Sequence, residues 1–443
     1  YNVLHTDLKW STNTEDKKRA SKYIESILLM LRTKVLLNNG DLSKTEIVWF
    51  YPASMTQNRF NKFKAEWENT FATLFGAPIS NIIAASESVA PYYYHKAKKG
   101  ATSTVVSVDI GGGTTDVLIV DKGEPKYLTS FRFAANTIFG DGYSYDSDSN
   151  GFVNKYKDII TNQLETNNLR GLKAVLKSVL DKRVSTDVIA FLFSLASNKE
   201  IKKEKVEINF AKMLADDNRG KYVVILFYVA IVYHIAKLMK AKGFDMPRHM
   251  TFSGNGSKVL NILSTNDATL VRLTKIIFEE IYAQSYSIDG LDIIRPANSK
   301  ESTCKGGIIL TPFQSQDYGE IKDMKTILIG TDNEKFADVH MTYNDVTEAD
   351  LDSVVDVIKE YIEFTFKLDK KFSFYDNFDV DRSIMNKVKD LCYRDIRTYL
   401  ENGLAIKKSE IAQDGADDNL EETLFFYPLV GIINAVVRNI YQM

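Results

Sequence analysis

The sequence predicts an α/β fold, because strand-like and helix-like segments alternate between about residues 45 and 265. The composition agrees: 44% of the residues are hydrophobic and 26% are charged, the balance of an ordinary globular protein. The length of 443 residues exceeds what one hydrophobic core usually holds, so we expect about two to four domains.

Five elements are expected before residue 100. Residues 15–40 have the apolar spacing of an amphipathic helix, which Thr14 can cap and Gly40 can end. The following segments are predicted, in order, as strand, helix, strand and helix: Glu46–Tyr51, Ser54–Gly76, Asn81–Ala85 and Glu87–Lys99.

The central region begins with two strands rich in β-branched residues, Thr102–Asp109 and Asp116–Val120, on either side of a glycine turn. Residues 150–240 are predicted to be mostly helical. Met250–Ser253 is predicted to be another strand, and a Gly-Asn-Gly turn follows it. After Gly307 the pattern is helical again.

Charge, cysteines and hydropathy exclude several classes of protein. The chain has 56 Lys and Arg against 58 Asp and Glu, so it lacks the basic excess that binds nucleic acid. Two cysteines, Cys304 and Cys392, cannot form a disulfide framework, which favours a reducing, cytoplasmic location. The apolar run Tyr222–Ala236 is too short to span a bilayer comfortably, so we expect a buried core helix and no membrane span.

Two polar features have a structural interpretation. His234 lies in the apolar run and is predicted to be a hydrogen-bonded core residue rather than a metal ligand. The acidic residues between 414 and 422 are predicted to form a solvated loop.

The segment most indicative of function is Asp109-Ile-Gly-Gly-Gly-Thr-Thr-Asp-Val117. Gly111, Gly112 and Gly113 allow the backbone to approach a ligand and to aim successive N–H groups at an anion. Thr114 and Thr115 add hydroxyl donors for phosphate oxygens. Asp109 and Asp116 are suited to a hydrated Mg²⁺, which prefers carboxylate, water and phosphate ligands. A glycine-rich hairpin without function is the alternative, and the flanking acids and threonines argue against it.

This segment resembles the second phosphate motif of the actin, DnaK-type chaperone and sugar-kinase ATPase superfamily. Further segments are similar to motifs of that family and occur in the same order. They are Ile82–Ala90, a strand-to-helix segment; Ala135–Gly142, a glycine turn; Phe252–Lys258, the adenosine motif; and Lys305–Gly307, a connecting helix between domains.

The resemblance implies an actin-like ATPase fold, in which two ribonuclease-H-like domains enclose a nucleotide cleft. It implies ATP and Mg²⁺ as cofactors, with phosphates at residues 111–115 and adenosine at Gly254, Asn255 and Gly256. It also implies that Glu87 orients the attacking water. On this basis we expect a truncated first domain at 1–100 and a second domain at 101–310 with a helical insertion near 150–220. A helical extension at 311–443 would pack back on the body.

The chain departs from the family in one respect. The first phosphate motif, an Asp-x-Gly-Thr hairpin, does not occur before residue 20, and Ile329–Asp332 is not a substitute because no Asp precedes its Gly. We therefore expect that the natural chain extends upstream of Tyr1.

The resemblance leaves several functions open. An ATP-driven filament or segregation protein, which would self-associate or bind a protein partner, is the first. A DnaK-type chaperone fits less well because residues 311–443 have a helical pattern. A small-molecule kinase of the same superfamily and a catalytically inactive scaffold are two further candidates.

Overall fold

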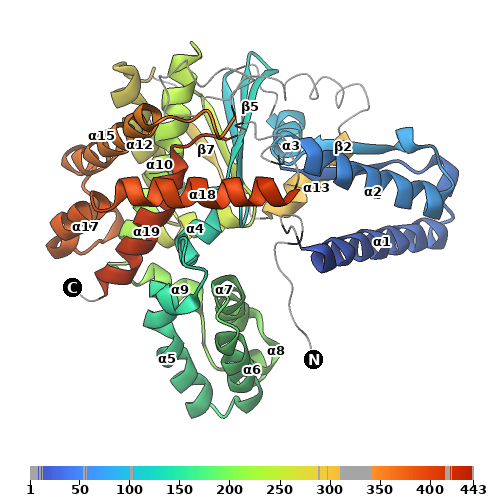
Figure 1. Cartoon of the computed structure of the whole chain (residues 1–443), viewed down its shortest axis with the longest axis horizontal. Coiled ribbons are helices and arrows are strands. Elements are labelled where there is room, and N and C mark those ends of the chain that lie inside the picture. The colour runs from blue at the N-terminus through green and yellow to red at the C-terminus, as the bar shows by residue number, and fades with distance from the viewer. Residues whose placement is uncertain are drawn as a thin grey trace.

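The computed structural model describes residues 13–52, 57–99, 103–287, 290–296, 298–309, 342–414 and 422–441, with Leu8, Ser11, Met55 and Leu420. These residues form two β-sheets with helices around them (Figure 1). The predicted mixed α/β class is confirmed. The predicted domain boundaries stay predictions.

The N-terminal part contains a small parallel sheet, in which β1 (Ile47–Tyr51) pairs with β2 (Ile82–Ser86). Two helices, α1 (Thr14–Leu37) and α2 (Gln57–Phe75), pack on it around buried Leu28, Trp49 and Phe71. Short 3₁₀ turns lie at Leu42–Lys44 and Ile79–Asn81. The second predicted helix begins at Gln57, and its predicted cap, Ser54, lies outside the described residues.

The larger sheet has the strand order β5-β4-β3-β6-β7. Its strands are β3 (Val105–Ile110), β4 (Thr115–Asp121), β5 (Glu124–Phe131), β6 (His249–Ser253) and β7 (Asp292–Ile294). β3, β4 and β5 pair antiparallel, whereas β3, β6 and β7 pair parallel. β3 is therefore the central strand, and its carboxyl end leads into the glycine turn.

The two faces of this sheet have different cores. On one face, Val105 and Leu118 pack against α3 (Val89–Lys99), and α13 (Ser299–Ile309) packs in turn on α3. On the other face, Val106, Val108 and Val117 join the main core of the molecule. All of β3 is buried, which agrees with its nearly continuous β-branched sequence.

A group of helices follows β5 in the sequence and lies below the large sheet in Figure 1. It comprises α4 (Ala135–Phe139), α5 (Gly151–Thr166), α6 (Arg170–Asp181), α7 (Ser185–Ser194), α8 (Lys199–Lys203) and α9 (Phe210–Ala215), with 3₁₀ turns at Ser147–Ser149 and Leu195–Ser197. Beyond β6 are a 3₁₀ turn at Gly256–Val259, α11 (Leu260–Leu263) and α12 (Asp267–Tyr282).

α10 (Lys221–Ala241) is the central helix of the main core. Every residue from Tyr222 to Ala236 is buried, as predicted for the apolar run. Among the described residues it is the one helix long and apolar enough to cross a membrane, and 94% of its most apolar stretch is buried inside the protein. The core helix of a soluble protein has the same properties.

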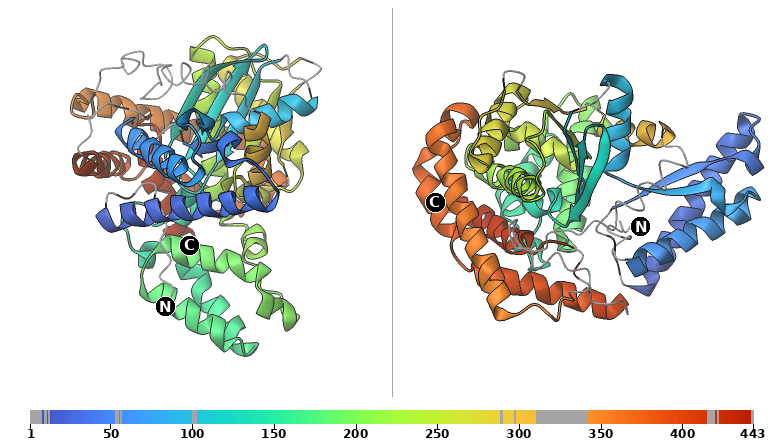
Figure 2. Two further views of the ribbon diagram at one scale, coloured as in Figure 1. Left: turned by 90° about the vertical axis from the view of Figure 1, so that its right-hand side faces the viewer. Right: turned by 90° about the horizontal axis from the view of Figure 1, so that it is seen from above.

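The C-terminal helices are α15 (Glu348–Phe372), α16 (Phe374–Phe378), α17 (Met385–Cys392), α18 (Ile396–Asp414) and α19 (Phe426–Ile440), with a 3₁₀ turn at Arg382–Ile384. α15 packs on α10 and α12, and α19 packs on α4, α5 and α10. The view from above in Figure 2 shows α15 and α17 on the side of the large sheet away from α1 and α2, whereas α18 runs from there toward α1. Residues 310–341, which include the Ile329–Asp332 segment, lie outside the described residues.

Candidate functional site

A row of buried polar side chains crosses the large sheet at the end nearest the glycine turn. In the strand register Ser130 faces Asp116, Asp116 faces Asp109, and Asp109 faces Ser253. Partners in register lie on the same face of a sheet. All four residues are at most 4% exposed, and Ser253 donates to Asp109 Oδ2 at 3.1 Å. Four adjacent polar side chains are unusual inside a core, because burial of polar groups costs free energy unless they are paired.

The glycine turn (Gly111–Thr114) is held by backbone hydrogen bonds. Gly111 N donates to Thr114 O at 2.8 Å and closes the turn. The amide of Asn136 donates to Gly112 O at 2.8 Å, and the hydroxyl of Thr115 donates to Phe133 O at 2.6 Å. Gly112, at the tip, is exposed. Hydrogen bonds thus fix the turn, while its tip stays accessible, as an anion-binding loop requires.

The turn after β6, Gly254-Asn255-Gly256, packs directly on the glycine turn. Gly254 has a φ of +79°, and a Cβ there would lie 2.2 Å from Ile110 O. A Cβ on Gly256 would lie 2.1 Å from Gly111 O. Only glycine allows this approach of two backbones. The structure therefore brings together two of the segments that the sequence singled out, which are separated by about 140 residues in the chain.

A cavity of about 570 Å³, the large cavity, opens beside these two turns. This volume lies in the usual range for small-molecule sites, about 300–1,000 Å³. Its polar lining includes Asn136, Asn255 and Lys258, and Gly112 and Gly256 contribute backbone. Its other walls are mostly apolar and come from α7, α9, α11 and the 3₁₀ turn before α11, with Ile189, Phe193, Ala211, Ile262 and Val259 among them. An apolar slot with a few polar groups at one end suits a flat heterocycle with a polar substituent.

The carboxylates of Asp109 and Asp116 suit a magnesium ion. They are register partners on an antiparallel pair, for which Cβ atoms lie about 4.5–5.5 Å apart. Two ionised carboxylates at this separation repel one another, and a cation beside them offsets the repulsion. Among the described residues no group of three or more His, Cys, Asp or Glu could hold a metal. Mg²⁺ in proteins usually takes one or two carboxylates together with water and phosphate oxygens.

Glu87 lies in the turn between β2 and α3, the helix that covers the face of the large sheet opposite the main core. Its amide donates to Tyr51 O at 3.0 Å, which fixes the turn to the end of β1. The predicted role of Glu87 in orienting water stays a prediction.

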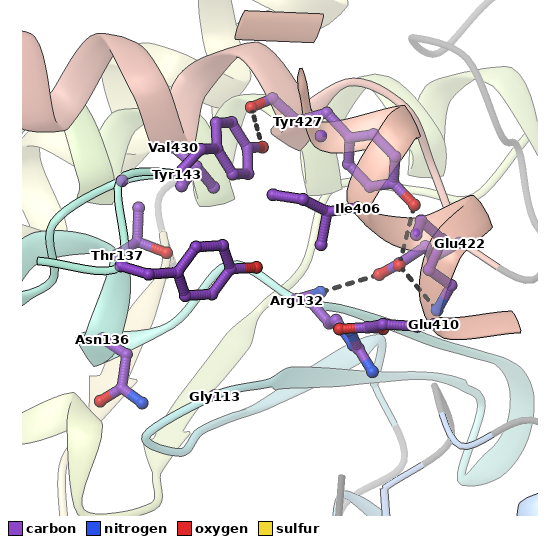
Figure 3. Close-up of a pocket in the computed structure, with 14 residues that line it drawn as sticks. Gly113, Arg132, Asn136, Thr137, Tyr143, Ile406, Glu410, Glu422, Tyr427 and Val430 are labelled. Atoms are coloured by element: carbon purple, nitrogen blue, oxygen red, sulfur yellow. Dashed lines mark hydrogen bonds and ion pairs between the residues drawn. The ribbon is translucent and has the colours of Figure 1, made fainter. Parts of the chain in front are cut away.

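A second, smaller cavity of about 220 Å³ lies between the glycine turn and the C-terminal helices, lined in part by Gly113, Thr137 and Tyr143 (Figure 3). An ionic cluster borders it. Arg132 pairs with Glu410 at 2.5 Å, and Lys407 pairs with Glu422 at 3.2 Å. Glu422 is 2% exposed, so the prediction of a solvated acidic loop is wrong for this residue.

Sequence reasoning missed three features of the site. Asn136 lines both cavities, and its backbone amide donates to the glycine turn. Only its place in the Ala135–Gly142 segment indicated a role. Lys258 belongs to the adenosine-like motif, and a basic residue beside a glycine turn is a signal for phosphate. The cluster around Glu422 has no local sequence signal.

Comparison with known proteins adds little. No protein-family model matches the chain. No curated protein matches it either. Among solved structures it is similar to the ethanolamine utilization protein EutJ from Carboxydothermus hydrogenoformans, with 12% identity and a TM-score of 0.30, over 70% of this chain and 79% of EutJ. This likeness is weak, so function has to follow from the chain's own residues.

Proposed function

We propose that the chain binds a magnesium–adenine nucleotide, with the phosphates at the glycine turn and the nucleoside in the large cavity. One observation carries this proposal. The glycine turn and the Gly254–Gly256 turn pack backbone to backbone, and both line one cavity of nucleoside size. A phosphate-binding turn beside an apolar slot is the arrangement that a nucleotide needs.

Each part of the site has a role in this proposal. The amides of Gly112 and Gly113 and the hydroxyl of Thr114 would bind phosphate oxygens. The Thr115 hydroxyl is buried and donates to Phe133 O, so the predicted role of Thr115 as a phosphate donor is not part of this proposal. Asp109 and Asp116 would hold Mg²⁺, which would offset the phosphate charge. Asn255 would contact the sugar or the base at the rim of the large cavity, and Lys258 would contact a phosphate.

An actin-like ATPase architecture with hydrolysis belongs to the same proposal. Glu87 would accept a proton from the attacking water or orient it, and nucleotide state would be expressed as movement between the N-terminal part and the large sheet. Such a movement would suit a filament or segregation protein, which would respond to its nucleotide by self-association.

The test is titration calorimetry of the chain with ATP, ADP and a non-hydrolysable ATP analogue, each with Mg²⁺ and with a chelator. We expect one site per chain, tighter binding with Mg²⁺, and weaker binding of GTP. At a nucleotide concentration 100 times the Kd the stabilisation is about 2.7 kcal/mol, which is visible as a rise in Tm. Absence of both heat and a Tm shift for every nucleotide would overturn the proposal.

A further inference from the structure

The segment Arg132–Asn136 lies between the glycine turn and the C-terminal helices. Toward the glycine turn, the amides of Ala135 and Asn136 donate to Gly111 O at 3.3 Å and to Gly112 O at 2.8 Å. The carbonyl of Phe133 accepts the hydroxyl of Thr115. A displacement of this segment would therefore move the turn.

Toward the C-terminal helices the same segment is fixed by Glu422. The Arg132 amide donates to Glu422 Oε2 at 3.0 Å, across 290 residues of sequence. Beside it, the Phe133 ring stacks on Phe426 with centroids 4.7 Å apart. Figure 3 shows Glu422 between Arg132 and Tyr427. The start of the segment is thus attached to the C-terminal helices.

The carboxylate of Glu422 is itself held rigidly. Burial by itself would raise the pKa of Glu422, but Lys407, Arg132 and the hydrogen bonds from the Arg132 amide and Tyr427 hold it below its usual value. Lys407 is 4% exposed, and the Tyr427 hydroxyl donates to Glu422 Oε1 at 3.0 Å. A buried ion pair is weak evidence for stability, because apolar side chains of the same size often stabilise a core as well. The position of this ion pair, beside the segment that holds the glycine turn, suggests a role other than stability.

We propose that Glu422 is a positioning residue for the nucleotide site: by accepting the Arg132 amide it fixes segment 132–136 and, through it, the glycine turn. The inference rests on the proposed function and goes beyond it, since it makes the C-terminal helices part of the binding machinery. By reciprocity, nucleotide bound at the turn stabilises the contact between Arg132 and the C-terminal helices.

A set of variants separates this role from a merely structural one. Glu422→Gln keeps an oxygen that can accept the Arg132 amide, so we expect the Kd for Mg-ATP to stay within about threefold of the parent. The double variant Lys407→Met, Glu422→Met replaces the buried pair with apolar side chains and removes that acceptor. We expect a folded protein whose Kd is about tenfold higher, as for the loss of one hydrogen bond to a charged group.

Glu410→Gln is the matched control. It weakens the ion pair of the Arg132 side chain and leaves the bond of the Arg132 amide in place, so its Kd is expected within about twofold of the parent. A folded double variant that binds within twofold of the parent would overturn the inference. Equal losses in Glu422→Gln and the double variant would overturn it too, because glutamine keeps the acceptor.

Hydrogen exchange on the unmodified chain tests the inference without any variant. Saturating Mg-nucleotide should slow amide exchange in residues 132–136 and in residues 422–427 together. Slowing confined to 132–136 would overturn the inference and leave the proposed function intact. If the unmodified chain binds no nucleotide in calorimetry, the proposed function fails, and this inference fails with it.

Discussion

Asp109 lies at the centre of the buried polar row, with Asp116 on one neighbouring strand and Ser253 on the other. It is the second-last residue of the central strand, two residues before the glycine turn. A carboxylate at this point can bind a metal that also binds the phosphates. Asp116 lies one strand further from the Gly254–Gly256 turn.

Asp109→Asn is expected to raise the Kd for Mg-ATP by about tenfold or more, because it neutralises a proposed charged ligand of Mg²⁺. The Kd measured with a chelator should change much less. Asp292→Asn is the control: it changes an acid at the far end of the same sheet, paired in register with His249. Equal effects of the two variants, measured by calorimetry, would contradict the role of Asp109.

Glu87→Gln separates chemistry from binding. The proposed role predicts nucleotide affinity within a few-fold of the parent and an ATP hydrolysis rate lower by roughly 10²–10⁴, the range for a lost general base. Steady-state phosphate release measures the rate. If Glu87 is only an acid near the start of α3, hydrolysis will be unchanged and the unfolding free energy will shift by less than about 1 kcal/mol.

His234 makes folding sensitive to acid. It is 1% exposed, neither ring nitrogen has a hydrogen-bond partner among the described residues, and Phe131, Phe425 and Phe426 surround it. The prediction of a hydrogen-bonded core histidine is therefore wrong in that respect. Burial lowers the pKa of His234 to about 3 from its ordinary value of 6.5.

Since the unfolded chain takes up a proton at His234 below pH 6.5 and the folded chain does so only near pH 3, this residue costs stability as the pH falls through that window. Its contribution approaches about 1.4 kcal/mol per pH unit. His234→Leu should reduce the loss of unfolding free energy between about pH 6.5 and 4, measured by urea denaturation. Parallel curves for the two proteins would contradict the assignment.

At the scale of elements, the contact between the glycine turn and the Gly254–Gly256 turn leaves the least room for a larger side chain. Gly256→Ala would bring a Cβ to 2.1 Å from Gly111 O and 2.8 Å from Ile110 O, both backbone atoms that cannot move aside without displacing the turn. We expect a lower Tm and a Kd for Mg-ATP at least about tenfold higher.

The control for this prediction is Gly171→Ala. Gly171 lies in α6, and an added Cβ would meet only Glu200 Oε2, at 3.9 Å. Alanine there should leave binding unchanged and raise stability by up to about 1 kcal/mol, the difference in helix propensity. A Gly256→Ala protein with parental affinity would show that the two turns do not act together.

The elements around the site could be predicted where their signal is local. The β-branched runs on either side of Gly111–Thr114 predicted β3 and β4, and the apolar run from Tyr222 predicted α10. Contacts between distant segments could not be predicted in this way. Arg132 meets Glu410 and Glu422 across 278 and 290 residues, and the acidic composition around 414–422 indicated solvent, not a buried pair. The large cavity likewise depends on how α7 packs near α11.

At the scale of the whole molecule, the central claim is that the base of a nucleotide lies in the large cavity while its phosphates reach the glycine turn. The two turns alone would allow phosphate binding without a nucleoside. The cavity walls from α7 and α11, two separate parts of the sequence, would bind the base and so make the site specific for a nucleotide.

Photoaffinity labelling with 8-azido-ATP and Mg²⁺, followed by peptide mapping, tests this claim most directly, because the reactive group is on the base. We predict labelling within residues 186–193 or 255–262, competed by ATP and by ADP and reduced in Asp109→Asn. Competed labelling confined to other segments, or labelling that ATP does not compete, would contradict the claim.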